Sequence, residues 1–210
     1  ETEEDFPNDV QELQHLLGEP QPGQPIIAMP GAGTQVPIWL LGSSLYSAQL
    51  AAQLGLPFAF ASHFAPRMLM QAIQIYRQTF RPSQQLAAPY VAIGVPLVAA
   101  PSDEEATYLA SSTHQRVLGI LTGRRGQLPP PVENFLLSLD SGAQAAIADF
   151  LAAAVIGGPD TVRAGLQQLD ALTQANELVL VSDVYDAESR RRSLDIAAAA
   201  ARELNAAVAQ

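Results

Sequence analysis

The segment that decides the fold runs Ile38-Trp-Leu-Leu-Gly-Ser-Ser-Leu-Tyr-Ser-Ala-Gln-Leu-Ala-Ala-Gln-Leu-Gly-Leu-Pro-Phe-Ala-Phe-Ala-Ser-His-Phe64. Four apolar residues lead into Gly42-Ser43-Ser44, an amphipathic stretch ends at Gly55, and a second apolar run ends in Ser62-His63. Apolar runs that do not alternate with polar residues are typical of strands buried on both faces, as in a parallel sheet covered by helices. The segment therefore predicts a strand, a helix and a second strand joined by crossovers.

The same alternation of strand and helix continues along the chain. Further buried strands are predicted at 90–100 and 177–182, which makes four with the runs at 38–41 and 56–61. The sequence thus predicts an α/β fold of about four parallel strands, as a β/α barrel or an open doubly wound sheet. Helices are predicted at 8–17 (capped by Asn8), 44–54, 66–80, after a Ser102/Glu105 capping box, 143–155, 157–172 and 190–208, with irregular regions at 18–37 and 113–142.

Composition narrows the functional classes. The chain has 210 residues, 48% of them apolar, which suits one domain with a substantial core. Its formal net charge is −10 and it has no lysine, which argues against nucleic acid as a partner. It has no cysteine, so disulfides and thiolate metal sites are excluded, and its three histidines are too scattered to predict a metal site. Without a long apolar segment or a signal-peptide pattern, we expect a cytoplasmic protein that does not enter the membrane.

The first strand–helix junction has the chemistry of an anion site. Gly42 allows close backbone approach, Ser43 and Ser44 offer hydroxyl and N–H groups at a helix start, and Ser47 lies one turn further on the same face. Free N–H groups and the helix dipole together favour a phosphate at such a place. Serine is also a very common N-cap, so a purely structural cap remains open from the residues alone.

Other polar residues follow the predicted strands. His63 ends the second one, where it would either face a cavity as a proton donor or satisfy a neighbouring backbone group. Asp183, Tyr185 and Asp186 follow the last strand and would either line the same pocket or serve as loop carboxylates, with Asp186 capping the final helix.

The sequence has two clusters of arginine, at 124–125 and at 190–192. Arg124 and Arg125 lie in a glycine-bounded loop, which is either a plain surface loop or an excursion that closes over a ligand. The run 190–192 is read as a solvated helix face.

Several segments carry a family resemblance. Residues 36–64, 157–162 and 177–186, and the helix within 5–18, resemble the luciferase-like, flavin-dependent monooxygenases, closest to the single-component subgroup and not to the light-emitting enzymes. This resemblance implies an eight-stranded β/α barrel that binds reduced FMN, or in some branches the deazaflavin F420, and in most members activates oxygen. It implies that the helix start with Gly42, Ser43, Ser44 and Ser47 holds the flavin phosphate, and it favours a cavity role for His63.

The resemblance also implies what the chain lacks. The four predicted strands match strands five to eight of the family pattern, so residues 1–210 are expected to form a single partial barrel domain without the N-terminal half. The implied activity is a monooxygenase that uses reduced FMN and oxygen on a small organic substrate, with electrons from a flavin reductase. The alternative is a non-catalytic split barrel module that assembles through its open sheet edges into an oligomer. A phosphate-binding barrel enzyme such as an isomerase is a weaker third option.

Overall fold

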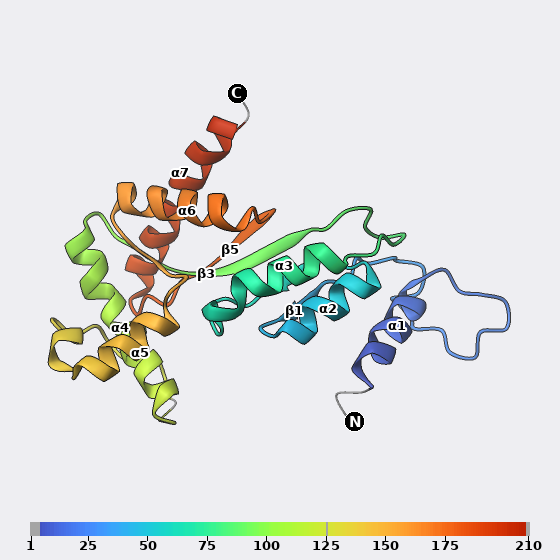
Figure 1. Cartoon of the computed structure of the whole chain (residues 1–210), viewed down its shortest axis with the longest axis horizontal. Helices are drawn as coiled ribbons and strands as arrows, with labels where there is room; N and C mark the ends of the chain where they lie inside the picture. The colour runs from blue at the N-terminus through green and yellow to red at the C-terminus, as the bar shows by residue number, and fades with distance from the viewer. Residues whose placement is uncertain (1–4, 125, 209–210) are drawn as a thin grey trace.

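The computed structural model describes residues 5–124 and 126–208 (Figure 1). Strands and helices take turns along most of the chain. In order, the elements are α1 (Phe6–Leu17), β1 (Leu40–Gly42), α2 (Leu45–Leu54), β2 (Phe58–Phe60), the short 3₁₀ turn η1 (Pro66–Met68), α3 (Leu69–Thr79), β3 (Val91–Ala99), α4 (Asp103–Leu121), the 3₁₀ turn η2 (Leu136–Ser138), α5 (Ser141–Phe150), β4 (Val155–Gly157), α6 (Pro159–Thr173), β5 (Glu177–Val181) and α7 (Ala187–Val208).

The five strands form one parallel sheet with β3 at its centre. The order is β1-β2-β3-β4, and β5 also pairs with β3. Along β3, residues 91–93 pair with β2, 92–96 with β5, and 97–99 with β4. In Figure 1, β3 crosses the middle of the molecule, with α1, α2 and α3 on one side of the view and α4 to α7 on the other. This architecture confirms the predicted α/β fold of parallel strands alternating with helices.

Strand register brings the functional segments to one edge. Gly42 lies opposite Phe60, Phe60 opposite Ile93, and Ile93 opposite Leu178. Because all strands run the same way, the residues that follow β1, β2 and β5 emerge at the same carboxyl edge of the sheet.

The two faces of the sheet differ in burial. Side chains alternate along a strand, and those of Phe58, Phe60 and Ile93 pack into the main core beneath α2 and α3, where Phe58 meets Tyr76 at 5.4 Å between ring centroids. On the other face, Leu41 is 71% and Val179 is 50% exposed. This second face is therefore uncovered at β1 and β5 but buried along β3, whereas β/α proteins of this kind normally cover both faces throughout.

The strand predictions hold with one omission. The runs at 56–61, 90–100 and 177–182 contain β2, β3 and β5, and the run at 38–41 overlaps β1, which extends one residue further to Gly42. The predicted helix over 143–155 ends at Phe150, and β4 follows it as a fifth strand that was not predicted. Its three residues follow an alanine-rich stretch, whose pattern does not distinguish a short strand from the continuation of a helix.

Several helix boundaries also differ from those predicted. α1 begins at Phe6, so Asn8 lies inside its first turn and is not the cap. α4 continues to Leu121, so the irregular region begins at 122 and not at 113. Ser102 caps α4 by accepting from the Glu105 N–H at 3.2 Å. The Glu105 carboxylate turns to Arg192 and not back to the cap, so the reciprocal half of the predicted capping box is replaced by a tertiary contact.

In the part of the chain that the structure describes, no helix is both long and apolar enough to cross a membrane.

Candidate functional site

The β1–α2 junction is a well-formed helix start. Ser44 has the extended backbone of an N-cap, and its Oγ accepts a hydrogen bond from the Ser47 N–H at 3.2 Å. The Ser47 hydroxyl donates in return to the Ser44 carbonyl at 2.8 Å. A Cβ added at Gly42 would lie 2.2 Å from Ser47 Oγ and 2.4 Å from Ser47 Cβ. The glycine is therefore required because the Ser47 side chain fills the space beside it.

The same junction keeps donors that the cap does not use. A helix start presents four N–H groups without intrahelical acceptors, and Ser44 Oγ takes only that of Ser47. Within residues 5–124 and 126–208, no acceptor is recorded for the N–H groups of Leu45 and Tyr46. The side chains of Ser43 and Ser44 are exposed beside them. The junction is therefore both a structural cap and a set of hydrogen-bond donors at the positive end of α2.

His63 lies against the middle of β3. A Cβ at Gly94 would stand 2.5 Å from His63 Nδ1, so this glycine gives the imidazole its place. The hydroxyl of the neighbouring Ser62, and not His63, donates to the Gly94 carbonyl. His63 Nδ1 is buried and has no hydrogen-bond partner among the described residues. The backbone role that would make His63 purely structural is thus filled by Ser62.

Two charged residues, Arg116 and Asp183, lie near His63 at the carboxyl edge of the sheet. Arg116, on α4, forms an ion pair with Asp183, which follows β5. Burial lowers the pKa of His63 most, the Arg116 charge lowers it further, and the Asp183 charge opposes both. The imidazole is therefore neutral at pH 7, with one nitrogen able to donate and the other to accept.

We call His63, Arg116 and Asp183 the carboxyl-edge cluster. Beside the unpaired His63 Nδ1, Arg116 Nε is also buried without a hydrogen-bond partner in the described part of the chain. Buried polar groups are nearly always hydrogen-bonded, so two such atoms in one cluster indicate a place that water or a ligand completes.

A cavity of about 620 Å³ adjoins this cluster. Phe64 and Arg116 belong to its wall and link it to the cluster, and Phe150 and Arg124 line it from α5 and the segment after α4. The volume lies within the range of small-molecule sites. Arg124 thus reaches the cavity, whereas Arg125 lies outside the described residues.

The residues that follow β5 have two different roles, because Asp183 belongs to the candidate site and Asp186 caps a helix. Asp183 joins the cluster, and Tyr185 is half-exposed. Asp186 accepts from the Ser189 N–H at 2.8 Å and caps α7, as the structural reading predicted, and these hydrogen bonds lower its pKa.

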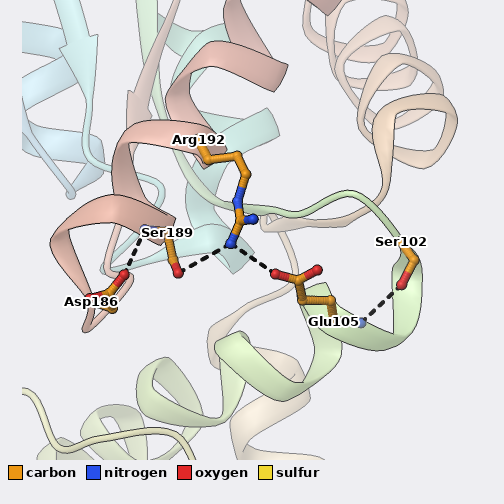
Figure 2. A network of polar contacts seen from close by, with 5 residues as sticks. All are labelled: Ser102, Glu105, Asp186, Ser189 and Arg192. Atoms are coloured by element: carbon orange, nitrogen blue, oxygen red, sulfur yellow. Dashed lines mark hydrogen bonds and ion pairs between the residues drawn. The ribbon is translucent and has the colours of Figure 1, made fainter.

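The arginine run 190–192 is a solvated face, with Arg191 paired to Glu188. Figure 2 shows Arg192 bridging Glu105 of α4 and Ser189 of α7, which ties the starts of these two helices together.

Three site residues were not predicted: Arg116, Phe64 and Phe150. A sequence feature could have identified Arg116 as a candidate, because it is the one charged side chain between Glu105 and Arg124. A single charge in such a stretch indicates a specific partner, but Asp183 is 67 positions away and no local pattern identifies it.

Comparisons with known proteins agree with this fold. A family model described as luciferase-like monooxygenase matches residues 3–174. A protein of Escherichia coli (strain K12) named luciferase-like monooxygenase is 41% identical over 201 residues, which are 96% of this chain and 60% of that protein. The crystal structure of apo-MsnO8 is 29% identical with a TM-score of 0.80, and the match covers 96% of this chain and 61% of MsnO8.

Two more distant structures share the fold and contain or use a named cofactor. Riboflavin lyase (RcaE) with modified FMN and the substrate riboflavin matches at 16% identity and TM-score 0.56, over 96% of this chain and 57% of the lyase. The coenzyme F420-dependent tetrahydromethanopterin reductase from Methanopyrus kandleri matches at 13% identity and TM-score 0.55, over 90% of this chain and 60% of the reductase.

The chain spans about 60% of the length of the relatives it matches. Within that span the family match covers most of its residues, including the β1–α2 junction and the carboxyl end of β2. The chain belongs to the luciferase-like monooxygenase family.

Proposed function

We propose that this chain forms the phosphate-binding part of a flavin-dependent monooxygenase that uses reduced FMN and oxygen on a small organic substrate. The observation that carries the proposal is the start of α2, where free N–H groups and the exposed Ser43 and Ser44 lie together at the carboxyl edge of the sheet. Parallel β/α folds bind their ligands at this edge.

The junction fits the phosphate group of a flavin. A phosphate dianion needs several donors and a positive local field, and the Leu45 and Tyr46 N–H groups supply both at the helix start. The Ser43 and Ser44 hydroxyls add rotatable donors, and Ser47 keeps the turn in shape through its bond to the Ser44 carbonyl. Gly42 is part of the same site because only a residue without a side chain leaves room for Ser47.

The neighbouring residues would border the flavin ring and the substrate. Bound reduced flavin supplies the electrons for oxygen activation. His63, neutral and with Nδ1 unpaired, is the candidate for holding or donating a proton at that atom. The cavity beside it, lined by Phe64, Arg116 and Phe150, offers apolar surface and would hold a small organic substrate.

The cofactor and the remaining partners belong to the same proposal. FMN is favoured because a flavin lyase shares the fold, and F420 is the alternative because an F420-dependent reductase shares it too. We further propose that residues 1–210 make up one partial barrel domain, that it functions in the cytoplasm, and that a flavin reductase supplies its electrons.

A phosphate-specific titration tests the proposal. Binding of FMN and of riboflavin is measured by quenching of flavin fluorescence, and we expect tighter binding of FMN. Replacing Ser43 and Ser44 by Ala should remove most of this preference and leave riboflavin binding unchanged. Ser102→Ala, which removes the equivalent cap of α4 away from the site, is the matched control. Equal affinities for FMN and riboflavin, or no binding of either, would refute the assignment for this chain.

The alternative is a non-catalytic module that assembles with other chains. The exposed Leu41 and Val179 on the uncovered sheet face favour it, because a buried sheet face is the normal state of such a fold. Sedimentation velocity distinguishes the two functions. An oligomer that neither binds flavin nor consumes oxygen with reduced flavin would support the module, and a flavin-binding monomer would contradict it.

A further inference from the structure

The 620 Å³ cavity beside the carboxyl-edge cluster carries charge of one sign. Among the described residues that line it are two arginines, Arg116 and Arg124, and two glutamines, and none of them is Asp or Glu. The chain as a whole has the opposite balance, with 21 acidic and 11 basic residues and a net charge of −10. The cavity is therefore a local positive region on an acidic molecule, and such a region attracts anions.

The turn after α4 brings the two arginines to the same place. Gly123 has a positive φ of 73°, which reverses the chain, and the Arg124 N–H donates to the Gly119 carbonyl at 2.7 Å. A Cβ added at Gly119 would lie 2.7 Å from the Arg124 carbonyl oxygen, so the two backbones are in contact. Gly119 lies three residues after Arg116, on the same face of α4. The Arg124 backbone is therefore about one helical turn from Arg116, and both side chains can reach one small ligand.

Both guanidinium groups keep donors that no side chain uses. Arg124 is exposed and forms no ion pair with any residue that the structure describes. Arg116 binds Asp183 through Nη2, and within 5–124 and 126–208 no acceptor is recorded for its Nη1. Asp183 does not line the cavity, so the ion pair presents its guanidinium there. The full charge of Arg124 and the remaining donors of Arg116 are thus available to an anion.

The wall of the cavity is held in place by bonds within the chain. Gln115 Nε2 donates to the Pro130 carbonyl at 2.9 Å, which attaches the segment after α4 back to the helix. Arg67 and Asp149 form an ion pair at 2.6 Å, which links η1 to the last turn of α5 beside Phe150. The cavity is therefore formed before a ligand enters, and this reduces the ordering cost of binding.

The rest of the lining is apolar and sets the kind of anion. Phe64, Ile120, Pro129 and Phe150 supply aromatic and aliphatic surface to the same cavity. Apolar surface of this kind favours a ligand with a hydrocarbon body. The planar guanidinium group matches the two oxygens of a carboxylate. An organic acid satisfies both parts of the cavity.

We propose that the substrate held in this cavity is a small organic carboxylic acid, bound as its anion. The carboxylate lies against Arg116 and Arg124, and the hydrocarbon part lies against Phe64 and Phe150. This inference rests on the proposed function, because that function makes the cavity the substrate site.

Calorimetric titration with benzoate, in the absence of flavin, tests the proposal, and benzamide serves as the uncharged analogue of the same shape. We expect saturable binding of benzoate and at least about tenfold weaker binding of benzamide, because the amide gains no charge-assisted hydrogen bond. Arg124→Gln should weaken benzoate binding by about the same factor and leave benzamide binding unchanged.

The matched control is Arg81→Gln. Arg81 is also exposed and has no ion pair among the described residues, but it follows α3 and does not line the cavity. We expect this variant to bind benzoate as the parent protein does. An equal loss in both variants would show that only the overall charge of the chain matters, and would overturn the proposal. The absence of saturable benzoate binding, or equal affinity for benzoate and benzamide, would overturn it too.

Two further titrations separate this proposal from neighbouring ones. Inorganic phosphate that binds as tightly as benzoate would show an anion site that makes no use of the apolar wall, which contradicts an organic acid. The preference of Arg124→Gln for FMN over riboflavin should equal that of the parent, and its loss would assign Arg124 to the cofactor phosphate instead. A parent protein that binds FMN but not benzoate would refute the substrate class alone. One that binds benzoate but not FMN would refute the flavin assignment alone.

Discussion

Replacing Gly42 by Ala tests how tightly the β1–α2 junction is packed. The new Cβ would lie 2.4 Å from Ser47 Cβ and 2.2 Å from Ser47 Oγ, both well inside van der Waals contact. Rotation of the Ser47 side chain moves Oγ but leaves Cβ in place. Relief therefore requires α2 to shift away from β1, although Ala48 and Ala51 of α2 are fully buried in the core.

The expected cost is that of an overpacked core site, about 1–3 kcal/mol. For a chain of this size, each kcal/mol lowers the melting temperature by about 2–4 °C, so Gly42→Ala should melt roughly 2–12 °C below the parent protein. Ser47→Ala should restore little of this, because it removes Oγ and keeps the Cβ that makes the irreducible contact.

A double-mutant cycle with Ser47→Gly, followed by urea denaturation, measures the contact itself. Ser47→Gly alone should cost roughly 0.5 kcal/mol through helix propensity. In the Gly42→Ala background, however, it should recover stability, because both close contacts disappear. Gly126→Ala is the control, since an added Cβ there meets nothing within 4 Å. Additive effects of the two changes, or full stability of Gly42→Ala, would show that Gly42 does not serve to admit Ser47.

Two further predictions concern buried polar groups. Burial lowers the pKa values of His63 and His114, so below about pH 6.5 the unfolded chain binds more protons than the folded one. The free energy of unfolding should therefore fall as the pH drops from 7 to 5. His114→Gln should make this pH dependence weaker, as measured by urea denaturation at each pH. Tyr76→Phe should cost about 1–3 kcal/mol, because the buried hydroxyl donates to the Leu56 carbonyl at 2.8 Å and accepts from the Tyr90 N–H at 3.1 Å, and an unchanged denaturation midpoint would contradict this.

The strands and helices could be predicted wherever buried residues form a continuous apolar or periodic pattern in the sequence. β3 reads as a strand from its sequence because all nine of its residues are buried and nearly all are apolar. α4 was predicted too short for the opposite reason. Its centre, 111–114, is a run of four polar residues that are all buried in the structure, so the sequence there indicates the end of a helix. Two of the four, Ser111 and Thr113, are paired with Val132 and Asp183, which lie far along the chain.

The parts of the candidate site that are formed by residues close together in sequence could also be predicted. The β1–α2 junction could be found because a strand, a glycine, serines and a helix follow one another in sequence, and His63 because it ends the next strand. The ion pair of Arg116 with Asp183 joins segments that only the folded sheet brings together, so the charged half of the carboxyl-edge cluster required the structure.

The cap and the phosphate site at α2 are not competing explanations of the same residues. The cap uses one lone pair of Ser44 and one N–H group, and the anion would use the N–H groups that remain. What sets this helix start apart is its surroundings. α4, α6 and α7, which also follow strands directly, each carry Asp or Glu in their first turn, and the start of α6 is further occupied by the Asp103 carboxylate. α2 carries none. In a chain with a net charge of −10, a helix start without carboxylates keeps its full positive end, and that is the condition an anionic cofactor requires.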